Sequence, residues 1–176
     1  MSGHNKWSKI KRQKGANDAS RSNMWGKLSR RITVESKAVG GDTNSPSLRA
    51  AIDAAKAVNM PKDTIARAVA KGVSTDANDL EAITYEAYGP GGAAIVISTL
   101  TDNRNRTAQE IKHLLTKNGI ALAAPGSATW AFEKTNDGYT PKTTVKLGEE
   151  DDATLMKLME AIDDHDDVQD VFTNAE

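Results

Sequence analysis

A run of basic residues near the start of the chain carries the strongest chemical signal in the sequence. Between Gly3 and Lys14 there are five Lys or Arg residues and no Asp or Glu. Cations at this density neutralise the phosphates of nucleic acids well. The alternative is a solvated helix face, but such a face normally mixes both signs of charge. The residues that we expect to contact nucleic acid here are Lys6, Trp7, Lys9, Lys11, Arg12, Lys14, Arg21, Lys27, Arg30 and Arg31.

Two tryptophans lie in this basic region. Tryptophan rings stack on nucleobases, but a tryptophan within an apolar helical stripe more often belongs to a core. Trp25 lies in such a stripe, so the core role is favoured for it. Trp7 has polar neighbours, and for it both roles stay open.

A second candidate for anion binding is the segment Asp102–Thr107, which follows a predicted strand and opens a predicted helix. Capping residues and the positive end of a helix gather anion-binding groups at such a place. Arg104 and Arg106 are therefore candidates for a second nucleic-acid contact. The alternative is plain helix capping with two solvated arginines, and the sequence favours neither.

The acidic segment Asp163–Asp167 raises the question of a metal site. It lacks the alternating spacing and the loop glycine of a calcium site, so a solvated acidic surface is favoured and no metal is expected. Acids near the end of a helix interact badly with its dipole. A balancing partner is therefore expected, such as the basic region of this or another copy.

No arrangement of residues indicates catalysis. The chain has no Cys, and its three His residues are far apart in sequence. A Ser/His/Asp elbow, paired carboxylates and a cofactor fingerprint are all missing from the sequence. Gly89–Gly92 lacks the lysine and hydroxyl of a phosphate loop and joins two predicted strands. We expect a protein that is not an enzyme and that uses no cofactor or small-molecule substrate.

The net charge of -1 hides a strong asymmetry along the chain. Residues 1–71 hold fifteen Lys or Arg and five Asp or Glu, whereas residues 72–176 hold eight and nineteen. One region is therefore suited to a polyanion. Signal-peptide and membrane-spanning patterns are missing, so a cytoplasmic location and no membrane partner are expected.

Helical periodicity dominates the first part of the chain. Apolar residues recur every three or four positions up to Val39, where Gly40 and Gly41 end the first helix, and two further helices follow, the last ending at Gly72. Residues 73–80 are polar and form a predicted linker. We therefore expect a basic, all-helical, nucleic-acid-binding domain over residues 1–72 with three main helices.

Beyond the linker the pattern predicts an α+β domain over residues 81–176, sandwich-like, with a mainly antiparallel sheet. A hairpin turns at Gly89–Gly92, helices are expected around Ile111 and Leu158, and a last strand is expected over Val168–Phe172. Further strands are expected at Ala128–Phe132 and at Val145–Leu147. Trp130 and Leu155 are expected to share one core.

Several of these segments also match motifs of a known family, and the matches extend over essentially the whole chain. In the first part they are Gly3-His4, Lys6-Trp7, Ile10-Lys11, Gly40-Gly41-Asp42, Leu48-Arg49-Ala50-Ala51-Ile52 and Asn59-Met60-Pro61-Lys62-Asp63. In the second part they are Tyr85-Glu86, Tyr88–Gly92, Thr101–Thr107, Lys117-Asn118-Gly119, Gly126-Ser127 with Trp130 and Phe132, Asp167–Val171 and Asn174-Ala175-Glu176. In these motifs the chain resembles the YebC/PmpR family.

The resemblance implies a regulator of gene expression, by direct DNA binding in bacteria. Mitochondrial relatives activate translation and bacterial members are linked to ribosomes, so RNA or the ribosome is the alternative target. Family members commonly carry a third domain inserted in the middle one. Here only Thr135–Lys142 joins the flanking segments, so that insertion, expected near 134–142, is absent. The oligomeric state and the binding sequence are not predicted.

Overall fold

Three helices follow one another in the first part of the chain, as the periodicity predicts. They are α2 (Asp18–Ala38), α3 (Pro46–Ala57) and α4 (Lys62–Val73). The structure, a computed structural model, describes residues 7, 18–75, 79–136 and 138–176. Gly40 and Gly41 adopt φ values of 60° and 80°. This left-handed pair ends α2 as expected.

The apolar stripes of the three helices meet in one hydrophobic cluster. Its buried members are Ile32, Leu48, Ala51, Ala55, Met60, Ile65 and Ala68. Trp25 packs against this cluster, and its Nε1 donates a hydrogen bond to the carbonyl oxygen of Val58 at 3.2 Å. The predicted core role of Trp25 is therefore confirmed.

Gly72 has a different role from the predicted one. It does not end α4, which continues to Val73. A Cβ at Gly72 would lie 2.5 Å from the carbonyl oxygen of Thr33 and 2.6 Å from the Cβ of Ser36. Only glycine permits this approach of α4 to α2. The Ser36 hydroxyl then donates to the carbonyl oxygen of Val69 at 2.7 Å, and the two helices are fixed side by side.

A four-stranded antiparallel sheet forms the second part of the fold. Its strands are β1 (Glu81–Tyr88), β2 (Ala94–Thr101), β3 (Leu122–Ala123) and β6 (Val168–Thr173), in the order β3-β1-β2-β6. The short helix η1 (Pro90–Gly92) makes the turn between β1 and β2. The predicted hairpin, the last strand and the α+β class are confirmed.

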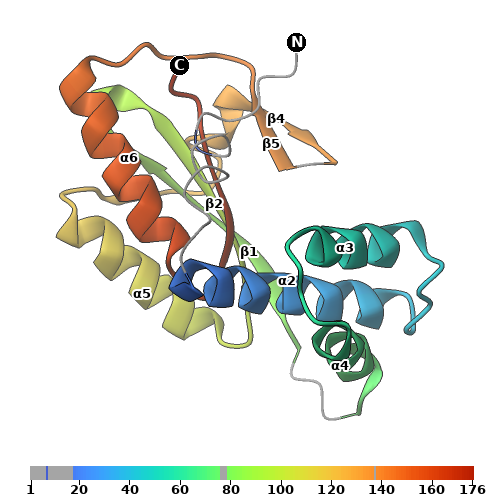
Figure 1. Ribbon diagram of the computed structural model, residues 1–176. Coiled ribbons are helices and arrows are strands. Elements are labelled where there is room, and N and C mark those ends of the chain that lie inside the picture. The colour runs from blue at the N-terminus through green and yellow to red at the C-terminus, as the bar shows by residue number, and fades with distance from the viewer. Residues whose placement is uncertain (1–6, 8–17, 76–78, 137) are drawn as a thin grey trace.

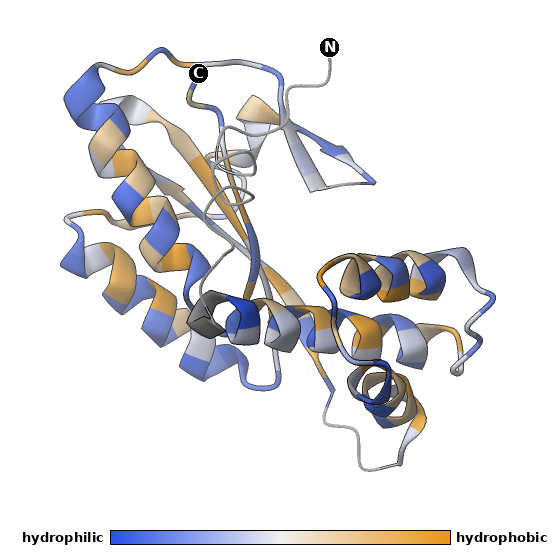
Figure 2. Cartoon of the chain, in the orientation of Figure 1, coloured by the Kyte–Doolittle hydropathy of each residue, from blue (hydrophilic) through white to orange (hydrophobic). Residues whose placement is uncertain are grey.

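Two helices cover one face of this sheet, α5 (Arg104–Lys117) and α6 (Glu149–Asp163) (Figure 1). In both helices apolar residues recur between polar ones, whereas β2 is largely apolar (Figure 2). Ile95 and Ile97 of β2 pack with Ile111 of α5 and with Leu155 and Met159 of α6 in the main hydrophobic cluster. Burial of these apolar residues holds α5 and α6 against the sheet.

A small hairpin lies on the other face of the sheet. It consists of β4 (Phe132–Thr135) and β5 (Gly138–Pro141), which pair antiparallel, and it follows the short helix η2 (Thr129–Ala131). The ring of Tyr139 meets the rings of Phe132 and Phe172 edge to face, at centroid distances of 6.2 and 5.5 Å. These aromatic contacts hold the hairpin against β6.

The prediction of a strand over Ala128–Phe132 is wrong. Residues 129–131 form η2 instead, because the backbone N–H groups of Ala128 and Thr129 donate to the carboxylate of Glu86 and are not available to a strand ladder. Trp130 is 57% exposed, so it shares no core with Leu155. The strand expected at Val145–Leu147 is reduced to a single parallel bridge between Val145 and Ala175.

Trp7 packs in the main cluster of the sheet region, where it is 4% exposed. A ring buried in this cluster does not stack on nucleobases, so the structure supports the core role for Trp7. Among the residues that the structure describes, no helix is long and apolar enough to cross a membrane.

Candidate nucleic-acid interface

The predicted site residues fall into four groups in the structure. Lys6, Lys9, Lys11, Arg12 and Lys14 lie outside the described residues. Trp7 is in the core, as described above. Arg21, Lys27, Arg30 and Arg31 follow one another along α2, and Arg104 and Arg106 lie in the first turn of α5. The structure brings Lys27, Arg30 and Arg106 together around the acidic segment Asp163–Asp167. Within the described residues, Arg31 and Arg104 make no ion pair with that segment, and Arg104 pairs with Glu81 instead.

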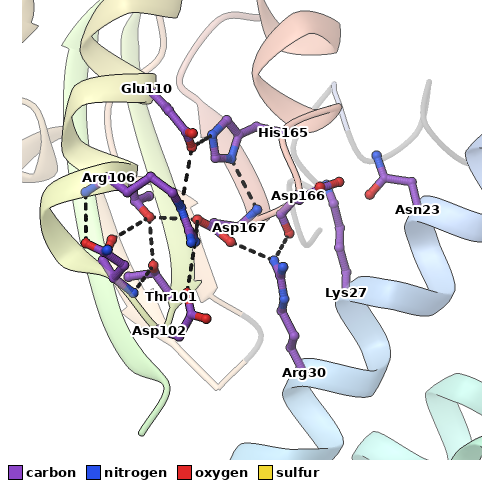
Figure 3. Close-up of polar contacts among 12 residues, drawn as sticks. Asn23, Lys27, Arg30, Thr101, Asp102, Arg106, Glu110, His165, Asp166 and Asp167 are labelled. Atoms are coloured by element: carbon purple, nitrogen blue, oxygen red, sulfur yellow. Dashed lines mark hydrogen bonds and ion pairs between the residues drawn. The ribbon is translucent and has the colours of Figure 1, made fainter. Parts of the chain in front are cut away.

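One face of α2 contacts the end of α6. Asn23 Nδ2 donates to the carbonyl oxygen of Asp164 at 3.2 Å, and Lys27 Nζ donates to the carbonyl oxygen of Asp163 (Figure 3). Lys27 also lies 3.3 Å from the Asp163 carboxylate and is 7% exposed. Cationic and amide groups of α2 therefore satisfy the negative end of α6. The expected balancing partner is the basic region of this same chain.

Asp167 is the centre of a polar network between the two regions. It is 3% exposed, and its carboxylate accepts hydrogen bonds from Thr107 Oγ1 at 2.7 Å and Arg106 Nη2 at 2.9 Å. Arg30 Nη1 lies 2.9 Å from its other oxygen and also donates to the carbonyl oxygen of Asp166 (Figure 3). Burial alone would raise the pKa of Asp167, but these partners outweigh burial and lower it.

The first turn of α5 is held mainly by contacts within the chain. Asn103 caps the helix, because its side-chain oxygen accepts from the backbone N–H of Arg106 at 3.1 Å. The guanidinium of Arg106 also lies 2.9 Å from Asp102, and Arg104 lies 3.6 Å from Glu81 in an exposed pair. Capping, one of the two alternatives for this segment, is therefore present. An additional anion contact by these arginines stays a prediction.

Glu110, His165 and Asp167 could in principle hold a metal, because their ligand atoms lie within 4.8 Å of one another. All three are engaged by other groups. The backbone N–H of Asp167 donates to His165 Nδ1 at 3.1 Å, which leaves Nε2 to donate to Glu110 at 3.0 Å. Both Asp167 oxygens are bound by the arginines described above. This cluster therefore forms a hydrogen-bonded contact between α5 and the residues that follow α6.

Several cations of the helical region remain exposed. Those that form no ion pair with any residue that the structure describes are Arg31, Arg49, Lys62, Arg67 and Lys71. Sequence reasoning missed Arg67 and Lys71, because the periodicity of this segment predicts only its apolar stripe. Their spacing of four residues, which places both on one helix face, was the signal available.

Arg67 and Lys71 face an open cleft of about 440 Å³ at the junction of the helical and sheet regions. Its walls come from α2, α4, the residue just before β1 and the residue just after β2. The lining residues are Ser29, Arg30, Thr33, Thr64, Arg67, Ala68, Lys71, Leu80 and Asp102. The described lining residues thus combine three cations with one carboxylate.

Sequence reasoning also missed a fixed aromatic pair on the sheet region. The indole Nε1 of exposed Trp130 donates to the Tyr88 hydroxyl at 2.9 Å, and that hydroxyl donates to the carbonyl oxygen of Ser127. Buried Glu86 holds the same loop through the backbone N–H groups of Gly126, Ala128 and Thr129. Burial would raise the pKa of Glu86, but these hydrogen bonds outweigh it and lower the pKa.

The sequence also matches known proteins along its whole length. The model of the TACO1/YebC protein N-terminal domain matches residues 5–75, and the model of the TACO1/YebC second and third domain matches residues 80–137 and 133–175. In the solved structures, a conserved hypothetical protein from Aquifex aeolicus is 29% identical with a TM-score of 0.82, and the match covers 90% of this chain and 91% of that one.

Curated relatives carry the name "probable transcriptional regulatory protein". The one from Petrotoga mobilis is 47% identical, with 100% of this chain and 71% of the relative covered. The one from Fervidobacterium nodosum is 39% identical, with 99% and 93% covered. That alignment spans 236 positions against the 176 residues of this chain, so at least 60 positions of the relative have no counterpart here. This chain is a short member of the TACO1/YebC family.

Proposed function

We propose that this protein binds nucleic acid and regulates gene expression, as a DNA-binding transcriptional regulator that acts in the cytoplasm. The names of its relatives support regulation of transcription. In this proposal the protein is a binding protein and not an enzyme, and it uses no cofactor.

The observation that carries the proposal is the distribution of charge over the helical region. Residues 18–75 hold ten Lys or Arg and five Asp or Glu, and residues 1–17 add five cations and no acid. The acidic segment at the end of α6 engages Lys27 and Arg30 among these cations. Five others are exposed and form no ion pair with any described residue, and such cations displace counterions from the phosphates that they meet.

The test is the salt dependence of binding to labelled duplex DNA and to RNA of the same sequence. Roughly four to six phosphate contacts predict a slope of log K against log salt near -4 to -5. Replacing Lys9, Lys11, Arg12 and Lys14 together by alanine should weaken binding to every sequence about equally and make the slope shallower.

The control replaces four exposed lysines of the sheet region, Lys112, Lys134, Lys142 and Lys146, and removes the same charge. It should leave the slope nearly unchanged. A slope near zero for the wild type contradicts nucleic-acid binding. A clear preference for RNA over DNA, or co-sedimentation with ribosomes, contradicts the DNA target and favours an RNA- or ribosome-associated role in translation.

A further inference from the structure

The cleft beside α4 is built from rigid parts. Thr33 Oγ1 donates to the carbonyl oxygen of Ala68 at 3.2 Å, and the close approach at Gly72 locks α2 to α4 on one side. On the other side, Arg30 ties α2 to Asp167 at the start of β6 at 2.9 Å. The α2 and α4 walls of the cleft are thus fixed to one another by contacts that do not involve a ligand.

The groups that face the cleft are suited to an anion. Arg67 and Lys71 are both exposed, and neither forms an ion pair within the part of the chain that the structure describes. The hydroxyl of Thr64 accepts a hydrogen bond from Arg67 Nη2 at 3.3 Å, which holds the guanidinium along the wall of the cleft. Arg30 adds a third cation, although Asp167 offsets its charge.

Among the described residues, Asp102 is the one acid that lines the cleft. Its carboxylate lies 2.9 Å from Arg106 Nη2, so its charge is balanced locally. The uncompensated charge of the cleft is therefore positive and comes from α4. A planar guanidinium beside an ammonium is the combination that binds the oxygens of a phosphate group.

We propose that this cleft binds a phosphate group of the nucleic-acid backbone. Its volume of about 440 Å³ is within the range of pockets that enclose a small ligand, and a single nucleotide unit is of that class. The inference rests on the proposed function and deepens it, because it assigns one phosphate contact to Arg67 and Lys71. A free phosphate monoester is the other source of the same chemistry.

The test compares two pairs of substitutions that remove the same charge. R67Q/K71Q removes the two cations of the cleft. R49Q/K62Q removes an exposed arginine of α3 and a lysine on the opposite side of α4. Binding of each variant to a short single-stranded DNA and to its duplex is measured by fluorescence anisotropy over a salt series. The melting temperature of each variant is the control for folding.

We expect R67Q/K71Q to make the salt slope for the duplex shallower by about 0.9, because one phosphate contact is lost, and to lower the affinity roughly tenfold at low salt. R49Q/K62Q should have a clearly smaller effect, and neither pair should change the melting temperature. Equal losses of DNA affinity in both variants would contradict the phosphate contact proposed for the cleft, while the proposed function would stand. A wild-type protein that binds no nucleic acid contradicts the proposed function itself.

A second arm distinguishes the source of the phosphate. Inorganic phosphate and a mononucleotide are titrated into the wild type and into R67Q/K71Q while amide chemical shifts are followed. Competition between the mononucleotide and DNA for the wild-type cleft supports the proposal. Phosphate binding that is lost in R67Q/K71Q while the DNA affinity stays unchanged overturns it and assigns the cleft to a free phosphate monoester.

Discussion

Glu86 illustrates how one buried carboxylate fixes a loop that is distant in sequence. It is 5% exposed and accepts three backbone hydrogen bonds from the loop before η2. The sequence pattern predicts a strand here, because alternating apolar residues fit a strand as well as an irregular loop. The deciding contacts join residues about forty positions apart, and no local pattern contains them.

Glu86→Gln should lower the free energy of unfolding at neutral pH by about 1 to 3 kcal/mol, because a neutral amide accepts these hydrogen bonds less strongly. The lowered pKa of Glu86 contributes stability above its ordinary pKa of 4.5, and this contribution is lost as the pH falls through the lowered value. In Glu86→Gln the free energy of unfolding should therefore fall less on acidification than it does in the wild type. Urea unfolding at neutral and acidic pH measures both effects.

Glu133→Gln, at an exposed position of β4, is the matched control. It should change neither the free energy of unfolding at neutral pH nor the loss of stability at acidic pH. A Glu86→Gln variant with unchanged stability at neutral pH would contradict the role given to this carboxylate.

Tyr85 offers the opposite case, a buried polar atom without a partner. Its hydroxyl makes no hydrogen bond to any described residue, and burial raises the pKa of this phenol. Tyr85→Phe should leave the free energy of unfolding unchanged or raise it by up to about 1 kcal/mol, because an unsatisfied group is removed. Thermal and urea unfolding measure the change. A loss of more than about 1 kcal/mol would mean that the hydroxyl does have a partner.

At the scale of elements, periodicity predicted the helices and the main hairpin well, because each has an apolar stripe of its own. It could not predict which cations of α2 would be used within the chain. Lys27 and Arg30 are spaced like the other basic residues of α2, and only the packing of α6 against this face distinguishes them. Charge counts therefore identified the basic helix but overestimated the cations free to meet a phosphate.

The contact of α2 with β6 can be measured by a double-mutant cycle on Arg30 and Asp167. With side-chain exposures of 32% and 4%, this pair should couple by about 1 to 2 kcal/mol in unfolding experiments. The exposed pair Asp53 and Lys56, at 3.4 Å, should couple by less than about 0.5 kcal/mol. Equal coupling energies in the two cycles are incompatible with a stabilising junction between the regions.

The hairpin of β4 and β5 lies where the two matched segments of the family model, residues 80–137 and 133–175, meet. We propose that longer relatives carry their additional residues at this turn. In this chain the hairpin closes the gap, and the ring of Tyr139 packs on Phe132 and Phe172. Asn136-Asp137-Gly138, between the two strands, is a strong turn signal in the sequence.

The halves of the sheet region before and after this hairpin should fold only together. Ending the chain at Thr135 removes α6 and β6, which uncovers the edge of β2 and the apolar face around Ile95 and Ile97. We expect the truncated protein to be unfolded or aggregated, as measured by circular dichroism and size-exclusion chromatography. Cooperative unfolding with an unchanged midpoint would show that the first half is stable alone.

For the whole molecule, the division of charge is the feature that the sequence predicted most directly. A net charge of -1 combines a basic helical region with an acidic sheet region, and the structure joins the two through Lys27, Arg30 and Asp167. The cleft with Arg67 and Lys71 opens at this junction. No sequence pattern contains that cleft, because its walls come from elements that meet only in the folded chain.

The central claim is that this protein contacts nucleic acid through the cations of its helical region. The most direct measurement is crosslinking in cells, followed by sequencing of both the bound DNA and the bound RNA, for the wild type, R67Q/K71Q and R49Q/K62Q. We predict enriched DNA fragments for the wild type, strongly reduced recovery for R67Q/K71Q and a smaller reduction for R49Q/K62Q. Recovery of neither DNA nor RNA above background from the wild type would contradict the claim.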